Sequence, residues 1–254
     1  MSNSADAGAY ADGGPHDLLR SMAALRRRAR TDRHAYGLPL LLFGALIAAA
    51  APLYVESTEP AALRAISTNP ALTSLGGDFL EHSAALGWYW LAALIAGYLT
   101  TLVWYRWHGQ RVGVQTPVRG YVIAGVVGTL VGLALPVVLE FLLFNTAAPV
   151  FRATSWATGP LLGVANRGML PHVVIAVGLA VLARLERSRG LWVVVAAYAA
   201  VIVLVTAWFQ LADLQPGDLS RFGFLLAALA PAPVLLIGGG AALLAARKRR
   251  PGSA

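Results

Sequence analysis

Long apolar stretches alternate with short polar ones along most of the chain. Six of them approach or exceed the length of about 20 residues that crosses a hydrocarbon core: residues 36–55, 86–105, 121–144, 168–185, 191–212 and 222–246. None alternates with a period of two, as the strands of a membrane barrel do. Because backbone groups in lipid must satisfy their own hydrogen bonds, we expect an all-α polytopic membrane protein with six transmembrane helices.

The composition agrees with this interpretation. Of 254 residues, 57% are hydrophobic and only 13% are charged, whereas a soluble domain carries about 25% charged residues. The chain contains no cysteine, which excludes disulfides, iron–sulfur clusters, cysteine-ligated zinc and cysteine nucleophiles.

The positions of the basic residues predict how the spans are oriented. If both termini lie on one side, that side collects 16 Lys and Arg residues and the other side collects 4. Cytoplasmic loops carry the excess of positive charge, so we expect a multi-pass protein of the bacterial cytoplasmic membrane with both termini inside. The net charge of +8 is then a topology signal, and we expect the lipid bilayer, not nucleic acid, as a partner.

Four regions follow from these patterns. Residues 1–14 are small and polar and should be disordered. Residues 15–35 combine a helical apolar stripe (Leu18, Met22, Leu25) with arginines, which is typical of a cytoplasmic amphipathic helix lying on the membrane interface. The transmembrane domain covers 36–246, and 247–254 form a basic cytoplasmic tail.

One carboxylate, Glu140, stands inside the apolar stretch LPVVLEFLLFN near the predicted outer end of the third span. His172 enters the fourth span at a similar depth, and the connection between these spans carries Asn145, Arg152 and Arg167. An intramembrane ionisable residue is a candidate functional group. Two interpretations stay open: a ligand or proton site, or an ion pair of Glu140 with Arg167 or Arg152 that holds the outer loop in place.

Metal binding and catalysis find less support in the sequence. His82, Glu140 and His172 are weak candidate metal ligands on the outer side, but they are dispersed and lack the spacing of a zinc motif. No P-loop, GxSxG or HExxH motif occurs. We therefore expect no cofactor and lean away from an enzyme.

Two further features concern the spans themselves. Pro231 and Pro233 should kink or break the sixth span near its middle, as in the discontinuous helices that line many transporter sites. The aromatic run Trp88, Tyr89 and Trp90 is expected to mark the outer membrane interface.

Parts of the chain resemble a group of six-span membrane proteins from actinomycetes that have no assigned activity. The resemblance rests on RRRARTDRHAYGLPLLLFGALI, GWYW, WYRWHGQRVGVQTP and LARLERS, and it implies a fold and a compartment. The span count, the interfacial helix and the basic loop 106–119 also resemble the permease subunits of type-two ABC exporters, although the loop 213–221 is shorter than theirs.

Three functions stay open on this basis. The chain is a transport subunit working with a cytoplasmic ATPase, a sensory protein that reads a ligand at the outer polar cluster for a cytoplasmic regulator, or a membrane-embedded enzyme. A homo-oligomer is compatible with each of them.

The charge asymmetry generates a labelling prediction. Cysteines introduced at Ser67 and Ser155 should react with a membrane-impermeant reagent on intact cells, and one at Ser188 should not. Reaction at Ser188 without reaction at Ser67 would contradict inward-facing termini.

Overall fold

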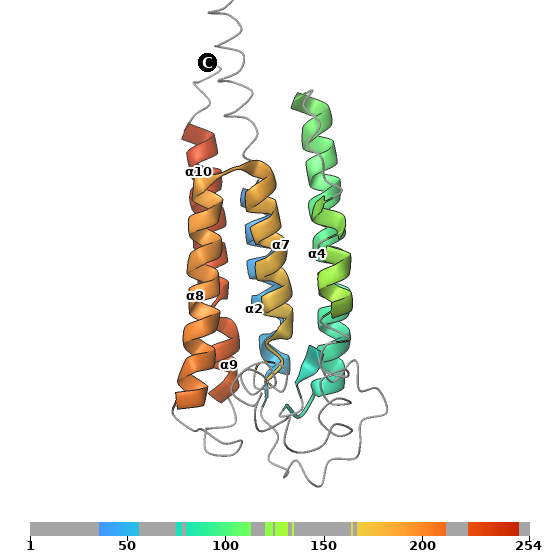
Figure 1. Cartoon of the computed structure of the whole chain (residues 1–254), viewed down its shortest axis with the longest axis vertical. Helices are drawn as coiled ribbons and strands as arrows, with labels where there is room; N and C mark the ends of the chain where they lie inside the picture. Colours follow the sequence, from blue (N-terminus) through green and yellow to red (C-terminus); the bar gives the residue numbers. More distant parts are fainter. Residues whose placement is uncertain are drawn as a thin grey trace, which may run out of the picture.

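The computed structural model describes residues 36–55, 75–77, 80–112, 120–123, 125–131, 134, 164, 167–211 and 223–248. In this part of the chain the structure is helical and contains no strand element, which confirms the all-α prediction (Figure 1). The elements are α2 (Gly37–Ala49), the 3-10 helix η1 (Ala51–Leu53), α4 (Ser83–Val112), α7 (Leu170–Glu186), α8 (Arg189–Leu211), α9 (Gly223–Leu229) and α10 (Ala232–Lys248). A further helical segment covers Gly120–Val131.

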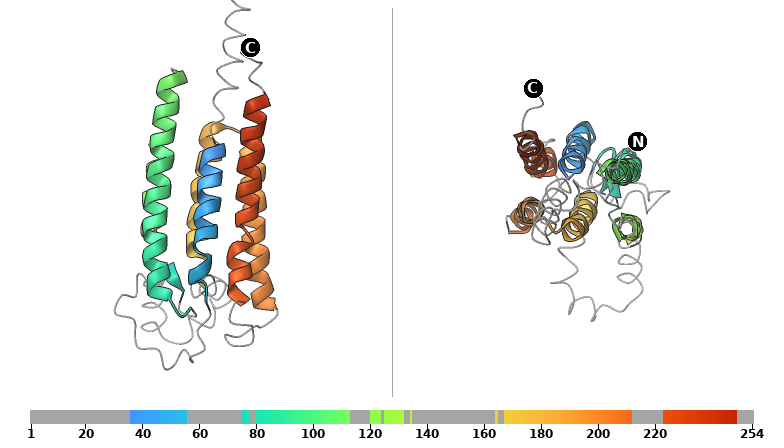
Figure 2. Two further views of the ribbon diagram at one scale, coloured as in Figure 1. Left: turned by 180° about the vertical axis from the view of Figure 1, so that it is seen from behind. Right: turned by 90° about the horizontal axis from the view of Figure 1, so that it is seen from above.

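The helices run side by side and form two layers (Figure 2). One layer contains α10, α2 and α4, and the other contains α8, α7 and the segment Gly120–Val131. Contacts join α10 to α8 and α4 to α7 across the layers. The buried core includes Phe43 of α2, Leu94 of α4 and Leu179 of α7.

Three helices are long and apolar enough to cross a membrane: Ser83–Trp107, Arg189–Phe209 and Gly223–Lys248. Their outward faces carry exposed large apolar side chains such as Val203, Leu226 and Ile237, which suit contact with lipid chains. The chain is therefore compatible with a membrane protein. The other predicted spans correspond to shorter apolar helices, so their number and their orientation stay predictions.

The first and the last described helices, α2 and α10, pack together through glycine. A Cβ atom added at Gly239 would lie 2.8 Å from Cγ of Leu41 and 2.9 Å from the Gly37 carbonyl oxygen. Small residues let helix backbones approach closely in membranes, where dispersion contacts supply much of the attraction between helices. The described chain therefore begins and ends at the same end of the bundle.

The final span is interrupted in its proline region. α9 ends at Leu229, Ala230 and Pro231 form a turn, and α10 begins at Ala232. Pro231 and Pro233 have no backbone N–H, so the carbonyls four residues earlier, those of Ala227 and Leu229, lose their usual helical donors. The interruption falls where the sequence places the two prolines.

Several sequence expectations fall outside the described residues. They are the disordered tail 1–14, the interfacial helix 15–35, and the site candidates Glu140, Asn145 and Arg152.

The tight connection from α7 to α8 makes Ser188 unsuitable as a position for an introduced cysteine in the labelling experiment. Arg187 adopts a left-handed conformation (φ 51°), and Ser188 Oγ accepts a hydrogen bond of 3.4 Å from the Leu191 backbone N–H. Ser188 is only 6% exposed, so a cysteine there would resist labelling from either side. The exposed neighbour Arg189 is the correct inner position.

At the same end of the bundle, α4 and α7 are joined by a polar contact. The Tyr105 hydroxyl donates a hydrogen bond to Oε1 of Glu186, the last residue of α7, which lies beyond the apolar stretch 168–185. Burial raises the pKa of the Glu186 carboxyl from 4.5 to about 7, and the hydrogen bond from Tyr105 partly opposes this rise.

This raised pKa predicts a dependence of stability on pH. The unfolded carboxyl releases its proton near pH 4.5 and the folded one near pH 7, so the folded protein should lose stability as the pH rises through this window. The loss is at most about 3–4 kcal/mol, at about 1.4 kcal/mol for each unit of pKa shift. The change in thermal midpoint in detergent from pH 4.5 to pH 7 should therefore be more negative in the wild type than in Glu186→Gln. Tyr105→Phe, which keeps the carboxyl, should move the transition to higher pH, and an unchanged slope in Glu186→Gln would refute this assignment.

Candidate functional site

Two of the buried polar or charged residues of the described chain, Arg167 and His172, lie where α7 begins. The segment before α7 turns at Arg167 and Gly168, and Gly168 adopts a positive φ of 67°. A Cβ atom there would lie 2.7 Å from the Gly76 carbonyl oxygen, so the turn has room only for glycine. Pro171 then occupies the first turn of α7, a position that needs no backbone donor. The turn directs Arg167 and His172 toward neighbouring helices.

His172 is completely buried and points at the interrupted helix. Its Nε2 lies 3.1 Å from the carbonyl oxygen of Ala228 in the last turn of α9. A carbonyl can only accept, so Nε2 carries the hydrogen and Nδ1 presents a lone pair. Within the described ranges Nδ1 has no hydrogen-bond partner. The Trp90 ring packs against the imidazole in an edge arrangement, with ring centroids 5.4 Å apart.

A chain of hydrogen bonds fixes this region from three sides. Trp90 Nε1 donates to the Tyr54 hydroxyl at 3.0 Å, and that hydroxyl donates to the Gly168 carbonyl oxygen at 2.9 Å. Tyr54 follows η1, Trp90 belongs to α4, and Gly168 precedes α7. The chain therefore ties three parts of the sequence to the turn that positions Arg167 and His172.

Arg167 is a buried cation stacked on aromatic rings. Its side chain is 9% exposed, and its guanidinium carbon lies 5.0 Å from the Phe209 ring centroid and 6.0 Å from that of Phe224. Nε and Nη1 have no hydrogen-bond partner in the part of the chain that the structure describes. Burial lowers the pKa of the guanidinium, yet arginine keeps its charge at neutral pH. A buried charge calls for an anion nearby.

Helix α9 brings the two side chains to one surface. Phe224 faces Arg167 and the Ala228 carbonyl faces His172, and these two positions are four residues apart, so they share one face of the helix. The separation along α9 is about 6 Å at 1.5 Å per residue. Arg167 and His172 thus border the same face of α9, just before the turn at Ala230 and Pro231.

The structure describes only some of the other predicted site residues. Whether Glu140, Asn145 and Arg152 join this cluster stays a prediction, because they lie outside the described residues. His82 is exposed at the start of α4, unlike the buried His172. Among the described residues no three His, Asp or Glu side chains lie close enough to hold a metal ion.

The sequence did not identify Tyr54 and Trp90 as site residues, and Trp90 differs from its neighbour Trp88 in being buried within the bundle. The run Trp88, Tyr89 and Trp90 was expected to lie at the interface. Trp88 is 59% exposed and Tyr89 is partly buried, but Trp90 is fully buried and hydrogen-bonded. Consecutive helical residues point about 100° apart, so three neighbours cannot all face lipid.

A paired substitution tests the hydrogen-bond chain. Tyr54→Phe would leave Trp90 Nε1 and the Gly168 carbonyl without their shared partner, and an unsatisfied buried group costs about 1–3 kcal/mol. The thermal midpoint in detergent should fall clearly. Tyr198→Phe is the matched control, because Tyr198 is equally buried but its hydroxyl has no hydrogen-bond partner within the described ranges. Equal losses in both variants would count against a special role for Tyr54.

No family model, no curated protein and no solved structure matches the chain. The functional argument therefore depends on the geometry of this site.

Proposed function

We propose that the chain is the membrane-embedded subunit of a transport system, with six spans and both termini in the cytoplasm, working with a separate cytoplasmic ATPase. One observation carries the proposal: buried Arg167 and His172 border one face of the short helix α9, directly before the span is interrupted at Ala230 and Pro231. Arg167 lies against Phe224 in the first turn of α9, and His172 against Ala228 in the last. Discontinuous helices beside buried polar groups are typical of substrate sites in transporters.

The interruption supplies the chemistry that such a site needs. A continuous helix in lipid uses every carbonyl internally, whereas a break frees carbonyls inside the bundle. Here Pro231 and Pro233 leave the carbonyls of Ala227 and Leu229 without their usual helical donors. His172 hydrogen-bonds to the carbonyl of Ala228, which lies between them. The guanidinium of Arg167 can donate hydrogen bonds to a polar substrate, and the lone pair on Nδ1 of His172 can accept one.

The architecture also supports movement at this point. α9 has 7 residues and α10 has 17, and the turn between them separates two helical rods within one span. A short helix can change its angle at a proline turn without breaking hydrogen bonds inside either rod. Such a change would expose the face of α9 that borders Arg167 and His172.

Cysteine accessibility tests the proposal, and the natural chain offers a cysteine-free background. Ala228→Cys places a thiol on the face of α9 toward His172, at a position that is 2% exposed. Leu226→Cys is the control on the same helix, because Leu226 is 78% exposed on the outer surface, where lipid would cover it. Both variants would be treated with a membrane-impermeant maleimide on intact cells and on inside-out vesicles, with and without ATP depletion.

A transport pathway predicts that Ala228→Cys reacts from both sides at rates that change on ATP depletion, while Leu226→Cys stays unreactive. Reaction from the outside alone, independent of ATP, would favour the sensory interpretation. Absence of reaction from either side would refute a pathway and leave the break as a packing feature.

A further inference from the structure

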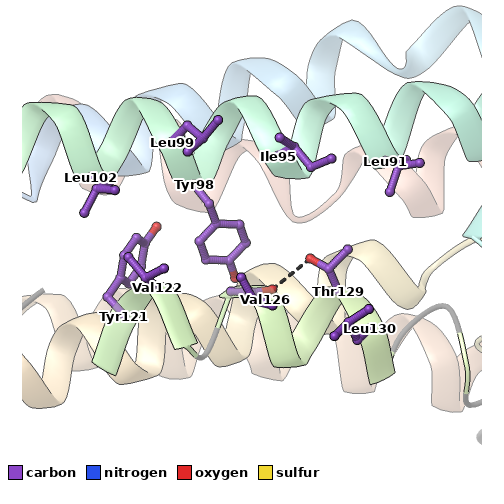
Figure 3. Close-up of a pocket in the computed structure, with 11 residues that line it drawn as sticks. Leu91, Ile95, Tyr98, Leu99, Leu102, Tyr121, Val122, Val126, Thr129 and Leu130 are labelled. Atoms are coloured by element: carbon purple, nitrogen blue, oxygen red, sulfur yellow. Dashed lines mark hydrogen bonds between the residues drawn. The ribbon is translucent and has the colours of Figure 1, made fainter. Parts of the chain in front are cut away.

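A second feature lies on the opposite side of the bundle from α8, between α4 and the segment Gly120–Val131 (Figure 3). An open groove of about 320 Å³ separates these helices. One wall carries Leu91, Ile95, Leu99 and Leu102 of α4, and the other includes Val122 and Val126. Most of these side chains are at least one-third exposed, so the groove opens on the outer surface of the described bundle.

Three hydroxyls lie at the groove. Those of Thr129 and Tyr98 are paired with backbone, and that of Tyr121 is buried without a hydrogen-bond partner in the described part of the chain. Thr129 Oγ1 donates to the Gly125 carbonyl oxygen at 2.8 Å. The Tyr98 hydroxyl reaches past the groove to α7 and donates to the Val174 carbonyl oxygen at 3.0 Å. The hydroxyls of Thr129 and Tyr98 therefore offer an occupant no unsatisfied donor, and the Tyr121 hydroxyl is buried away from the surface. The predominantly apolar lining favours a hydrocarbon chain over a polar ligand.

The groove is about as long as one leaflet of a bilayer is thick, and it crosses the middle of the predicted span 86–105. Leu91 and Leu102 are 11 positions apart on a continuous helix, which corresponds to about 16 Å at 1.5 Å per residue. Half of a hydrocarbon core is about 15 Å thick. A single acyl chain lying along α4 would follow the groove from one end to the other.

Charge marks the end of the groove where a headgroup would lie. Positions 91, 95, 99, 102 and 106 follow one another at helical spacing, so Arg106 continues the stripe formed by the groove residues. Arg106 is exposed, and the neighbouring Trp107 is 42% exposed, as suits a membrane interface. The sequence adds Arg111 and Arg119 in the same connection.

From these observations we infer that the groove is a binding site for an anionic phospholipid. One acyl chain fills the space between α4 and Gly120–Val131, and the phosphate pairs with Arg106. The site is independent of the transport proposal, because none of its lining residues belongs to α7, α8, α9 or α10.

Photo-crosslinking of the full-length protein tests this inference. Purified protein would be reconstituted with phosphatidylglycerol carrying a diazirine in the middle of one chain, or with the matching phosphatidylcholine. Crosslinks are expected to concentrate on residues 91–102 and 120–131. Crosslinks spread evenly over all lipid-facing helices would overturn a specific site, since they would indicate ordinary annular lipid.

Substitutions test the groove for the acyl chain separately from the contact between Arg106 and the phosphate. Val126→Trp fills the groove and should lower crosslinking about tenfold, because losing burial of only two methylene groups is sufficient for this factor. Val203→Trp on the outer face of α8 is the matched control, since Val203 is 65% exposed and does not line the groove. Leu99→Phe blocks the groove from the α4 wall and replaces Val126→Trp if that variant does not fold.

The proposed contact between Arg106 and the phosphate is measured by the preference for an anionic lipid over a zwitterionic one. Arg106→Gln should reduce the preference for phosphatidylglycerol over phosphatidylcholine about fivefold, as expected for one arginine near a membrane surface. Arg189→Gln, an exposed arginine at the start of α8, should leave the preference unchanged. Equal effects of the two arginine variants, or crosslinks that join two protein copies across Val126, would overturn the lipid assignment.

Discussion

A hydrocarbon environment offers no hydrogen-bond partners, and the arrangement of this bundle follows from that constraint. Threonine hydroxyls donate hydrogen bonds to carbonyls of their own helix, as Thr101 does to Gly97 and Thr206 to Ile202. Tyrosines instead reach neighbouring helices, as Tyr89 does to the Leu46 carbonyl and Tyr98 to the Val174 carbonyl. Such bonds satisfy the polar group and also set the distance between helices.

Several buried groups of the described chain depart from this rule: the hydroxyls of Tyr121 and Tyr198, and two side chains that lie together at the start of α7. Nε and Nη1 of Arg167 and Nδ1 of His172 have no hydrogen-bond partner in the described part of the chain, and both side chains border the face of α9 that precedes the turn at Ala230 and Pro231. Leaving such groups unsatisfied destabilises the fold, and strain of this kind is typical of functional sites. The same region is held by the bonds among Tyr54, Trp90 and Gly168, so the unsatisfied groups are rigidly placed.

The sequence predicted those parts of the fold that local pattern controls. Apolar stretches identified α4, α8 and the α9–α10 span, and the sequence showed that a helix could not continue undisturbed through Pro231 and Pro233. It could not predict that α2 packs against α10, because the glycines that allow this contact are some 200 residues apart and helical spacing says nothing about partners.

For the site, His172 was chosen as an ionisable residue entering an apolar stretch, and Arg167 as a candidate partner of Glu140 on the connection before that stretch. The roles of Tyr54 and Trp90 depend on contacts between distant segments, and Trp90 has the same local signature as the exposed Trp88.

The polar site and the lipid groove meet on α7. Tyr98 lines the groove and bonds to the Val174 carbonyl, two residues after His172. Its hydroxyl fits there because position 178 is glycine, where a Cβ atom would lie only 2.1 Å from the hydroxyl oxygen. A shift of α7 along its axis would strain the Tyr98–Val174 bond and the His172–Ala228 bond together, since both belong to one rigid helix. Coupling between two sites needs an element with which both interact, and in the described bundle α7 meets that requirement.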